Sequence, residues 1–263
     1  KRRERISSMA AQLVLHGMVL SVLPVGEADK RIVLLTRERG KISAFAKGAR
    51  RSNSPLLAKC QSFAVGEFSC YEGKDSYTIV QAEISRYFHE VQKDLEAVCY
   101  GCYFCEFAAY FARENLEAGE LLDLLYVTLS MLVEKRFPYS LLRYIFEWKV
   151  LTLEGEAPWM FDCVVCHCKE GPFYFSYEKC GVLCKDCMQK YGEKYKENRI
   201  GLEETIRLVL GYISTSPMNR VYRFQISKDM AENFSKFVHS YVKRIVVHDF
   251  KSLKMIEPVK DCF

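Results

Sequence analysis

The segment CVVCHCKEGPFYFSYEKCGVLCKDC, residues 163–187, contains two pairs of cysteines that determine how this part of the chain folds. Cys163 and Cys166 have a two-residue gap, as do Cys184 and Cys187, and 17 residues separate the pairs. A two-residue gap lets a tight turn aim both sulfurs at one metal ion, and a connection of this length suits a hairpin that returns the second pair to the first. The segment predicts a small module around one tetrahedral zinc ion.

Three other side chains in this segment offer alternative ligands for a distorted or oxidised site: His167, Cys168 and Cys180. Single cysteines are also often buried as apolar residues, but the paired spacing argues against that interpretation for the other four. A site of four thiolates leaves no open coordination position, so the metal stabilises the fold and does not activate water. We expect one structural zinc ion and no catalysis there.

The composition is that of a folded protein with more than one domain. The chain has 263 residues, 49% of them hydrophobic and 13% aromatic, enough for two or three domains with filled cores. Twelve cysteines would suggest disulfides in a short secreted chain, but paired metal-binding spacing indicates a reducing compartment. The apolar stretch Leu13–Leu23 is too short to cross a bilayer. We predict a cytoplasmic protein without a membrane anchor.

Residues 12–88 are predicted to form short β-strands, because β-branched and aromatic residues are bounded there by turn residues. The expected strands are Leu13–Leu23, Ile32–Thr36, Lys41–Ala46, Ser62–Tyr71 and Tyr77–Ala82. Gly17 and Gly66, inside two of these strands, are typical of the bulges and bends that close a barrel. Five short strands favour the oligonucleotide-binding barrel, or OB-fold.

From residue 89 onward the apolar residues recur with the period of helices. The expected helices are 92–113, 120–135, 139–153, 201–214 and 228–247, with Ser227 as N-cap of the last. The zinc module occupies about 160–190 and a polar run at 190–199 follows it. The sequence thus predicts an α+β multidomain protein. Its expected parts are a flexible basic arm or non-native start at 1–11, a five-stranded OB-fold barrel at 12–88, and a helical domain at 89–263 with the inserted four-cysteine zinc module.

The sequence contains no phosphate loop, dinucleotide-binding glycine motif, nucleophile elbow or zinc-protease motif. Glu147-Trp-Lys149 matches a fragment of some metal-dependent nucleases, but it falls within a predicted helix without other carboxylates to hold Mg²⁺. Cys102 and Cys105 have the spacing of a redox pair. Because they lie with Cys99 among aromatic residues of a predicted helix, we interpret all three as core thiols. We do not expect an enzyme.

Residues 30–51 concentrate positive charge, with eight cations against the single anion Glu38, a net charge of +7 in a chain of net charge +5. The cations are Lys30, Arg31, Arg37, Arg39, Lys41, Lys47, Arg50 and Arg51. Cations on the strands and loops of a barrel can follow a phosphodiester backbone, which gives affinity that depends on salt more than on base sequence. Phe45 either stacks on a base or lies in the core. We predict that the eight cations bind nucleic acid; the alternative is a solvated charged face.

The order of these motifs resembles the RecO family of bacterial DNA-repair proteins, from about residue 12 to about residue 245. The segments that carry the resemblance are GEADKRIVLLT at 26–36, GKI at 40–42, KGARR at 47–51, LTLEG at 151–155, Pro158, the first cysteine pair, FS at 175–176 and GVLCKDC at 181–187. The chain departs from the family pattern at two positions. His167 stands where a glycine often follows the second cysteine, and Cys180 replaces the first of a common glycine pair.

The resemblance implies a recombination mediator that binds single- and double-stranded DNA and works without ATP hydrolysis. Such a protein anneals complementary strands coated by single-stranded DNA-binding protein and helps RecR load RecA. The implied partners are therefore DNA, RecR and the acidic C-terminal tail of the single-strand-binding protein. When bound to DNA, the protein is expected to lie on the bacterial nucleoid. The sequence does not place the pocket for that tail; Arg143, Tyr144 and Trp148 are one grouping among others that combines aromatic side chains with a cation. The alternative function is a zinc-ribbon scaffold that binds proteins and has little affinity for DNA.

Overall fold

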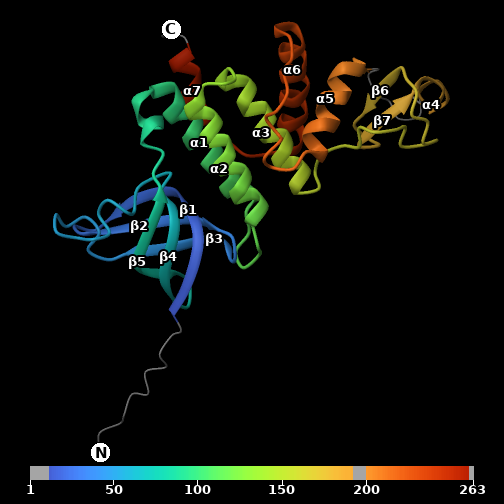
Figure 1. The fold of residues 1–263 in the computed structure, drawn as a ribbon. Helices are drawn as coiled ribbons and strands as arrows, with labels where there is room; N and C mark the ends of the chain where they lie inside the picture. Colours follow the sequence, from blue (N-terminus) through green and yellow to red (C-terminus); the bar gives the residue numbers. More distant parts are fainter. Residues whose placement is uncertain (1–11, 192–199, 261–263) are drawn as a thin grey trace, which may run out of the picture. The chain divides into compact units, whose positions relative to one another are not determined.

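The structure is a computed structural model that describes residues 12–191 and 200–260 (Figure 1). The predicted basic arm, Cys262 and most of the polar run at 190–199 lie outside these residues.

By their internal contacts the residues form two compact units. One comprises residues 1–134 and 250–263, and the other comprises residues 135–249. The first unit contains the barrel together with helices that follow it.

The first unit begins with a closed five-stranded barrel, as predicted. The strands are β1 (Gln12–Val25), β2 (Asp29–Thr36), β3 (Gly40–Ala46), β4 (Val65–Glu72) and β5 (Tyr77–Arg86). Their order around the barrel is β1-β2-β3-β5-β4, with β4 pairing back to β1. All pairs are antiparallel except β3 with β5. This is the Greek-key order of an OB-fold, and Figure 1 shows the strands curled into a barrel.

Buried and partly exposed residues alternate most regularly along β3. In β3, Ile42, Ala44 and Ala46 are buried, whereas the residues between them are partly exposed. Gly17 and Gly66 are paired in the ladder between β1 and β4, and a Cβ at either position would lie within 2.5 Å of a backbone oxygen of a neighbouring strand. The β4–β5 register also shifts beside Gly66. These glycines therefore allow the close strand packing that closes the barrel.

Three α-helices and a short 3₁₀-helix complete the first unit. They are η1 (His89–Lys93), α1 (Leu95–Phe111), α2 (Gly119–Glu134) and α7 (Leu253–Lys260). The Asp94 side chain caps α1 by accepting a hydrogen bond from the Ala97 backbone N–H. Helix α7 was not predicted. The Glu106 carboxylate of α1 accepts hydrogen bonds from the backbone N–H groups of Lys251 and Ser252, which fixes the segment that leads into α7.

The second unit consists of helices and a small antiparallel sheet. Its elements are α3 (Tyr139–Leu153), β6 (Phe173–Ser176), β7 (Gly181–Cys184), α4 (Lys185–Tyr191), β8 (Ile200–Leu202), α5 (Glu204–Thr215) and α6 (Lys228–Ile245). The sheet order is β7-β6-β8. Because residues 200–202 pair with β6, α5 begins at Glu204, later than predicted. Ser227 caps α6 as expected, accepting a hydrogen bond from the Met230 N–H.

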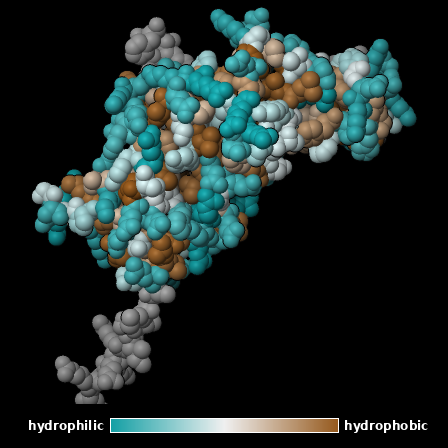
Figure 2. Space-filling model, viewed as in Figure 1, coloured by the Kyte–Doolittle hydropathy of each residue, from teal (hydrophilic) through white to brown (hydrophobic). Residues whose placement is uncertain are grey.

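The surface is that of a folded protein without a large apolar patch on the side drawn in Figure 2. There, hydrophobic side chains reach the surface in small groups among hydrophilic ones. Within residues 12–191 and 200–260, none of the helices combines the length and the apolar character needed to span a bilayer.

Candidate metal centre and nucleic-acid interface

The four predicted zinc cysteines come together at one point of the second unit. The sulfur atoms of Cys163, Cys166, Cys184 and Cys187 all lie within 4.8 Å of one another, and the Cys166 and Cys184 sulfurs are 3.6 Å apart. Four sulfurs at about 2.3 Å from a tetrahedral zinc would be about 3.8 Å apart. All but Cys166 are buried. The donor set and its spacing therefore fit one tetrahedral metal ion.

Backbone hydrogen bonds hold the two cysteine pairs in register. The first pair lies on a turn in which the His167 N–H donates to the Cys163 carbonyl at 2.8 Å. The Val164 N–H of this turn donates to the Val182 carbonyl of β7 at 3.0 Å. Cys184 ends β7, and Cys187 follows in the first turn of α4. The hairpin of β6 and β7 thus brings the second pair to the first.

The electrostatics of the cluster favour a cation. Burial raises the pKa of the Cys163 thiol, but hydrogen bonds from the backbone N–H groups of Cys184, Cys166 and Val165 together lower it by more. The resulting pKa is about 7, below the usual value for cysteine. Burial and the neighbouring thiols raise the pKa of Cys187 well above its usual value. Four crowded thiols cannot ionise together unless positive charge compensates them, and a divalent metal ion supplies that charge.

The three alternative ligands point elsewhere. The Cys168 sulfur contacts the Glu170 carbonyl at 3.4 Å, and the Cys180 sulfur contacts the Tyr177 carbonyl at 3.5 Å. The exposed His167 ring lies 3.6 Å from the Asp162 carboxylate.

His167 and Cys180 also explain the two departures from the family pattern. Both have positive φ, +60° and +48°, in the left-handed region that favours glycine. The backbone therefore keeps a conformation suited to glycine although the side chains differ.

Cation–π and aromatic contacts attach the cysteine module to the helices of its unit. The Arg207 guanidinium of α5 donates to the carbonyls of Met160 and Phe161 and lies over the Phe173 ring, 4.7 Å from its centroid. In α6, Arg244 lies 4.5 Å from the centroid of Tyr177. These contacts make the module a fixed part of the second unit.

The Glu147-Trp-Lys149 fragment has a structural role. Glu147 is fully buried and pairs with Arg143 at 2.5 Å, and the Lys149 ammonium donates to the carbonyls of Ser214 and Ser216. Trp148 is also fully buried, and its indole N–H donates to the Leu210 carbonyl. Of the grouping considered for a partner tail, Arg143 and Trp148 are therefore buried, whereas Tyr144 is partly exposed.

The eight predicted DNA-binding cations fall into two groups at opposite ends of β2 and β3. At the β2–β3 turn, Arg37 forms an ion pair with Asp123 of α2 at 2.5 Å. The Lys41 ammonium donates to the Ala109 carbonyl in the last turn of α1 at 2.7 Å. Arg39 lies in the same turn and is partly buried. The cationic groups of Arg37 and Lys41 thus join the barrel to its helices.

At the other end, Lys30 also has a structural role, because its ammonium donates to the carbonyls of Leu57 and Cys60 at 3.0 Å each. The remaining four predicted cations are exposed, and we call them the basic end: Arg31, Lys47, Arg50 and Arg51. Their turn is fixed against β2, since the Gly48 N–H donates to the Asp29 carboxylate at 2.7 Å.

Two aromatic rings lie on the outer face of the barrel near this basic end. Phe45 is partly exposed and outside the core, because it alternates with buried Ala44 and Ala46. The strand registers place Arg31 opposite Phe45, Phe45 opposite Thr78, and Thr78 opposite the exposed Tyr71. Tyr71 could not be identified from the sequence, since its place in this row depends on the β4–β5 register. The row combines a cation with two rings available for stacking.

Two protein-family models match this chain. The model for the N-terminal part of recombination protein O matches residues 9–88, and the model for its C-terminal part matches residues 92–254.

The chain belongs to the RecO family.

Relatives named DNA repair protein RecO match the chain along most of its length. The protein of Acetivibrio thermocellus is 32% identical over 243 residues, which cover 92% of this chain and 94% of the relative. That of Alkaliphilus metalliredigens is 28% identical over 249 residues, covering 93% and 98%. That of Bacillus pumilus is 34% identical over 175 residues, covering 66% and 68%. The barrel strands fall within the residues matched by the N-terminal RecO model, and the cysteine cluster falls within those matched by the C-terminal RecO model.

Proposed function

We propose that this protein is a recombination mediator. It binds single- and double-stranded DNA through its barrel, anneals complementary strands coated by single-stranded DNA-binding protein, and helps RecR load RecA without ATP hydrolysis. Membership of the RecO family supports a role in DNA repair and recombination. The observation that carries the DNA-binding part is the basic end of an OB-fold barrel, with Phe45 and Tyr71 on the adjoining outer face.

The proposed mode of DNA binding uses the basic end for phosphates and the two rings for bases. Of the eight predicted cations, Arg31, Lys47, Arg50 and Arg51 make up the exposed basic end, whereas Arg37 is exposed but pairs with Asp123. Lys30, Arg37 and Lys41 contribute to folding through the contacts described above. Arg39, partly buried at the β2–β3 turn, contributes less to DNA binding than the basic end does. Phosphate contacts position the strand, and stacking on Phe45 or Tyr71 tolerates any base. This chemistry suits annealing, because annealing must work on strands of any sequence.

The proposed cofactor is one structural zinc ion held by Cys163, Cys166, Cys184 and Cys187. Bound there, zinc would neutralise the thiolates and stabilise the module. Metal analysis of the purified protein should find one zinc per chain. A Cys184→Ser/Cys187→Ser variant should contain none, whereas Cys168→Ser should keep the full amount. Zinc retained by the double variant would contradict the assignment.

The proposed docking site for the tail of the single-strand-binding protein is a cavity of about 310 Å³ in the second unit. Leu202, Ile206 and Phe237 supply apolar walls for the end of such a tail, and Lys236 supplies a cation for its acidic residues. A labelled peptide with the acidic, apolar-ended sequence of that tail should bind the intact protein, and Lys236→Glu should weaken the binding. Unchanged affinity in Lys236→Glu would place the tail elsewhere.

The test of the whole function is annealing of complementary strands coated with the cognate single-strand-binding protein, without ATP. Faster annealing with intact strands is the expected result. Folded, metal-loaded protein that does not accelerate annealing would favour the protein-binding scaffold, and shortened strands would indicate a nuclease. A version that begins at Met9 controls for binding by the first eight residues.

A further inference from the structure

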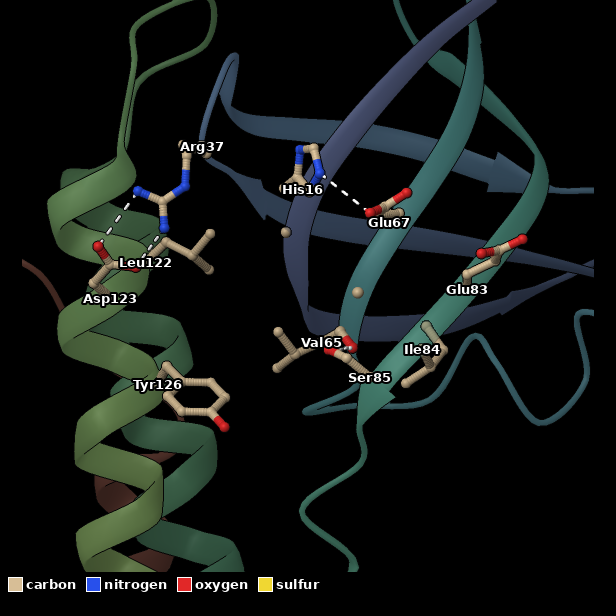
Figure 3. A pocket seen from close by; sticks show the side chains of 12 residues that line it. His16, Arg37, Val65, Glu67, Glu83, Ile84, Ser85, Leu122, Asp123 and Tyr126 are labelled. Atoms are coloured by element: carbon tan, nitrogen blue, oxygen red, sulfur yellow. Dashed lines mark hydrogen bonds and ion pairs between the residues drawn. The ribbon is translucent and has the colours of Figure 1, made fainter.

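A second cavity lies within the first unit, between the barrel and α2, and has a volume of about 500 Å³. Figure 3 shows β1, β4 and β5 on one side of it and α2 on the other. Its apolar lining comes from Val65 and Ile84 on the strands and from Leu122 and Tyr126 on the helix. Tyr126 is 39% exposed, so part of this apolar surface is open to a ligand.

Contacts between the barrel and α2 hold the two walls of this cleft. The ion pair of Arg37 with Asp123 links the β2–β3 turn to the helix. The Tyr126 ring packs edge-on against Phe88, which follows β5, with centroids 5.4 Å apart. Because both contacts join the same two walls, the cleft is already formed without a ligand.

A row of ionisable side chains crosses the strand wall of the cleft. The registers place His16 of β1 opposite Glu67 of β4, and Glu67 opposite Glu83 of β5. Like charges directly opposite each other in a ladder are destabilising. Glu83 accepts a hydrogen bond from the neutral Gln81 amide at 3.0 Å, and Glu67 lies 3.4 Å from the His16 ring. In the part of the chain that the structure describes, no lysine or arginine forms an ion pair with either glutamate.

His16 does not neutralise this row. Its Nδ1 lies 2.7 Å from a carboxylate oxygen of Glu38, and its backbone N–H donates to the other oxygen of Glu38 at 3.1 Å. A protonated His16 is therefore shared between Glu38 and Glu67. The cleft keeps negative charge on a chain whose net charge is +5.

We propose that this cleft binds a basic side chain of a protein partner, an arginine or lysine placed between Glu67 and Glu83, with an adjoining apolar residue of the partner against Leu122 and Tyr126. A cation there would relieve the repulsion between the two carboxylates, and a guanidinium can donate to both. The carboxylates repel phosphate, so the cleft is not a continuation of the DNA surface. The apolar wall selects a peptide over a small hydrophilic polycation.

The experiment measures binding of a fluorescein-labelled peptide of alternating leucine and arginine to the full chain by fluorescence anisotropy. Glu67→Gln/Glu83→Gln should weaken binding at least about tenfold, because two charge-assisted contacts are lost. Tyr126→Ala should also weaken it. The matched control is Glu117→Gln/Glu232→Gln, which removes two exposed carboxylates outside the cleft and should leave affinity unchanged.

Weaker binding by Glu67→Gln/Glu83→Gln cannot be caused by unfolding. Removal of a like-charge pair should leave this variant at least as resistant to thermal unfolding as the unchanged protein. Unchanged peptide affinity in that variant would overturn the proposal. So would equal binding of a peptide in which alanine replaces every leucine, or full displacement by spermidine at matched charge. Either result would mean that the cleft attracts cations in general and does not recognise a protein segment.

Discussion

Replacing Lys47 and Arg51 by glutamine should halve the salt dependence of single-stranded DNA binding. Both side chains are exposed at the end of the barrel, and neither donates to a protein acceptor in the described part of the chain. The substitutions therefore remove charge without removing a contact that stabilises the fold. Arg31 and Arg50, the other two members of the basic end, remain in place.

The expected size follows from counterion release. If each of the four cations of the basic end neutralises one phosphate, log K falls with log salt with a slope of about −2.8 for single strands, and with two cations the slope is about −1.4. A rise from about 50 to about 200 mM KCl should then weaken binding by the unchanged protein about 50-fold, and by Lys47→Gln/Arg51→Gln about 7-fold. At low salt the variant should also bind more weakly.

The assay is fluorescence anisotropy of a labelled oligothymidylate over a series of KCl concentrations. Lys228→Gln/Lys243→Gln, which removes two exposed cations of α6, is the matched control and should keep the steeper slope. An unchanged slope in Lys47→Gln/Arg51→Gln would refute the placement of DNA on the basic end. Equal flattening in the control would show that net charge alone governs binding.

Four further results are expected. Cys163→Ser should lose bound metal and unfold the β6–β7 module, because a structural zinc contributes on the order of 10 kcal/mol to folding; metal analysis and proteolysis of residues 160–190 check this. His167→Gly and Cys180→Gly should each change the free energy of unfolding in urea by about 0 to +1 kcal/mol, since relief of positive φ outweighs or balances the greater entropy of unfolded glycine, and destabilisation would contradict it. Hydrogen bonding to Glu38 raises the pKa of His16 in the folded protein. The stability that His16 adds relative to His16→Gln should therefore be full below the unfolded pKa and disappear as the pH rises through the raised folded pKa. Thermal melting of both proteins from about pH 5 to about pH 9 tests this sign. Glu106→Gln should speed amide hydrogen exchange at residues 251 and 252 about tenfold, because a charged acceptor is replaced by a neutral one.

The sequence was sufficient for those features that depend on local spacing. The cysteine pairs determine their own turns, and the five strands are short alternating segments, so both could be predicted without long-range contacts. The helix stripe of α6 and its Ser227 cap are local for the same reason. Helix α7 was missed because Glu106, more than 140 residues earlier, supplies acceptors for the residues before it.

The functional surface was harder to predict because charge in a sequence does not reveal its partner. Lys41 and Lys47 look alike in the segment 30–51, yet Lys41 donates to a carbonyl 68 residues away, whereas Lys47 is exposed. Phe45 could be assigned to the outer face only when the burial of its neighbours along β3 was known. The positive φ of His167 and Cys180 was signalled only by the glycines that the family pattern often has at these two positions.

The barrel thus carries two charged surfaces of opposite sign that can work at the same time. The acidic row crosses β1 at His16, whereas the basic end adjoins β1 where Leu23 pairs with Arg31. These positions are seven residues apart, or about 23 Å along the strand. The Debye length at physiological ionic strength is about 8 Å, so each surface is largely screened from the other. At low salt the screening weakens, and a basic partner bound in the cleft would then also reduce the repulsion between Glu67, Glu83 and the DNA phosphates. Occupation of the cleft and of the basic end should therefore be independent at physiological salt and mutually favourable below it.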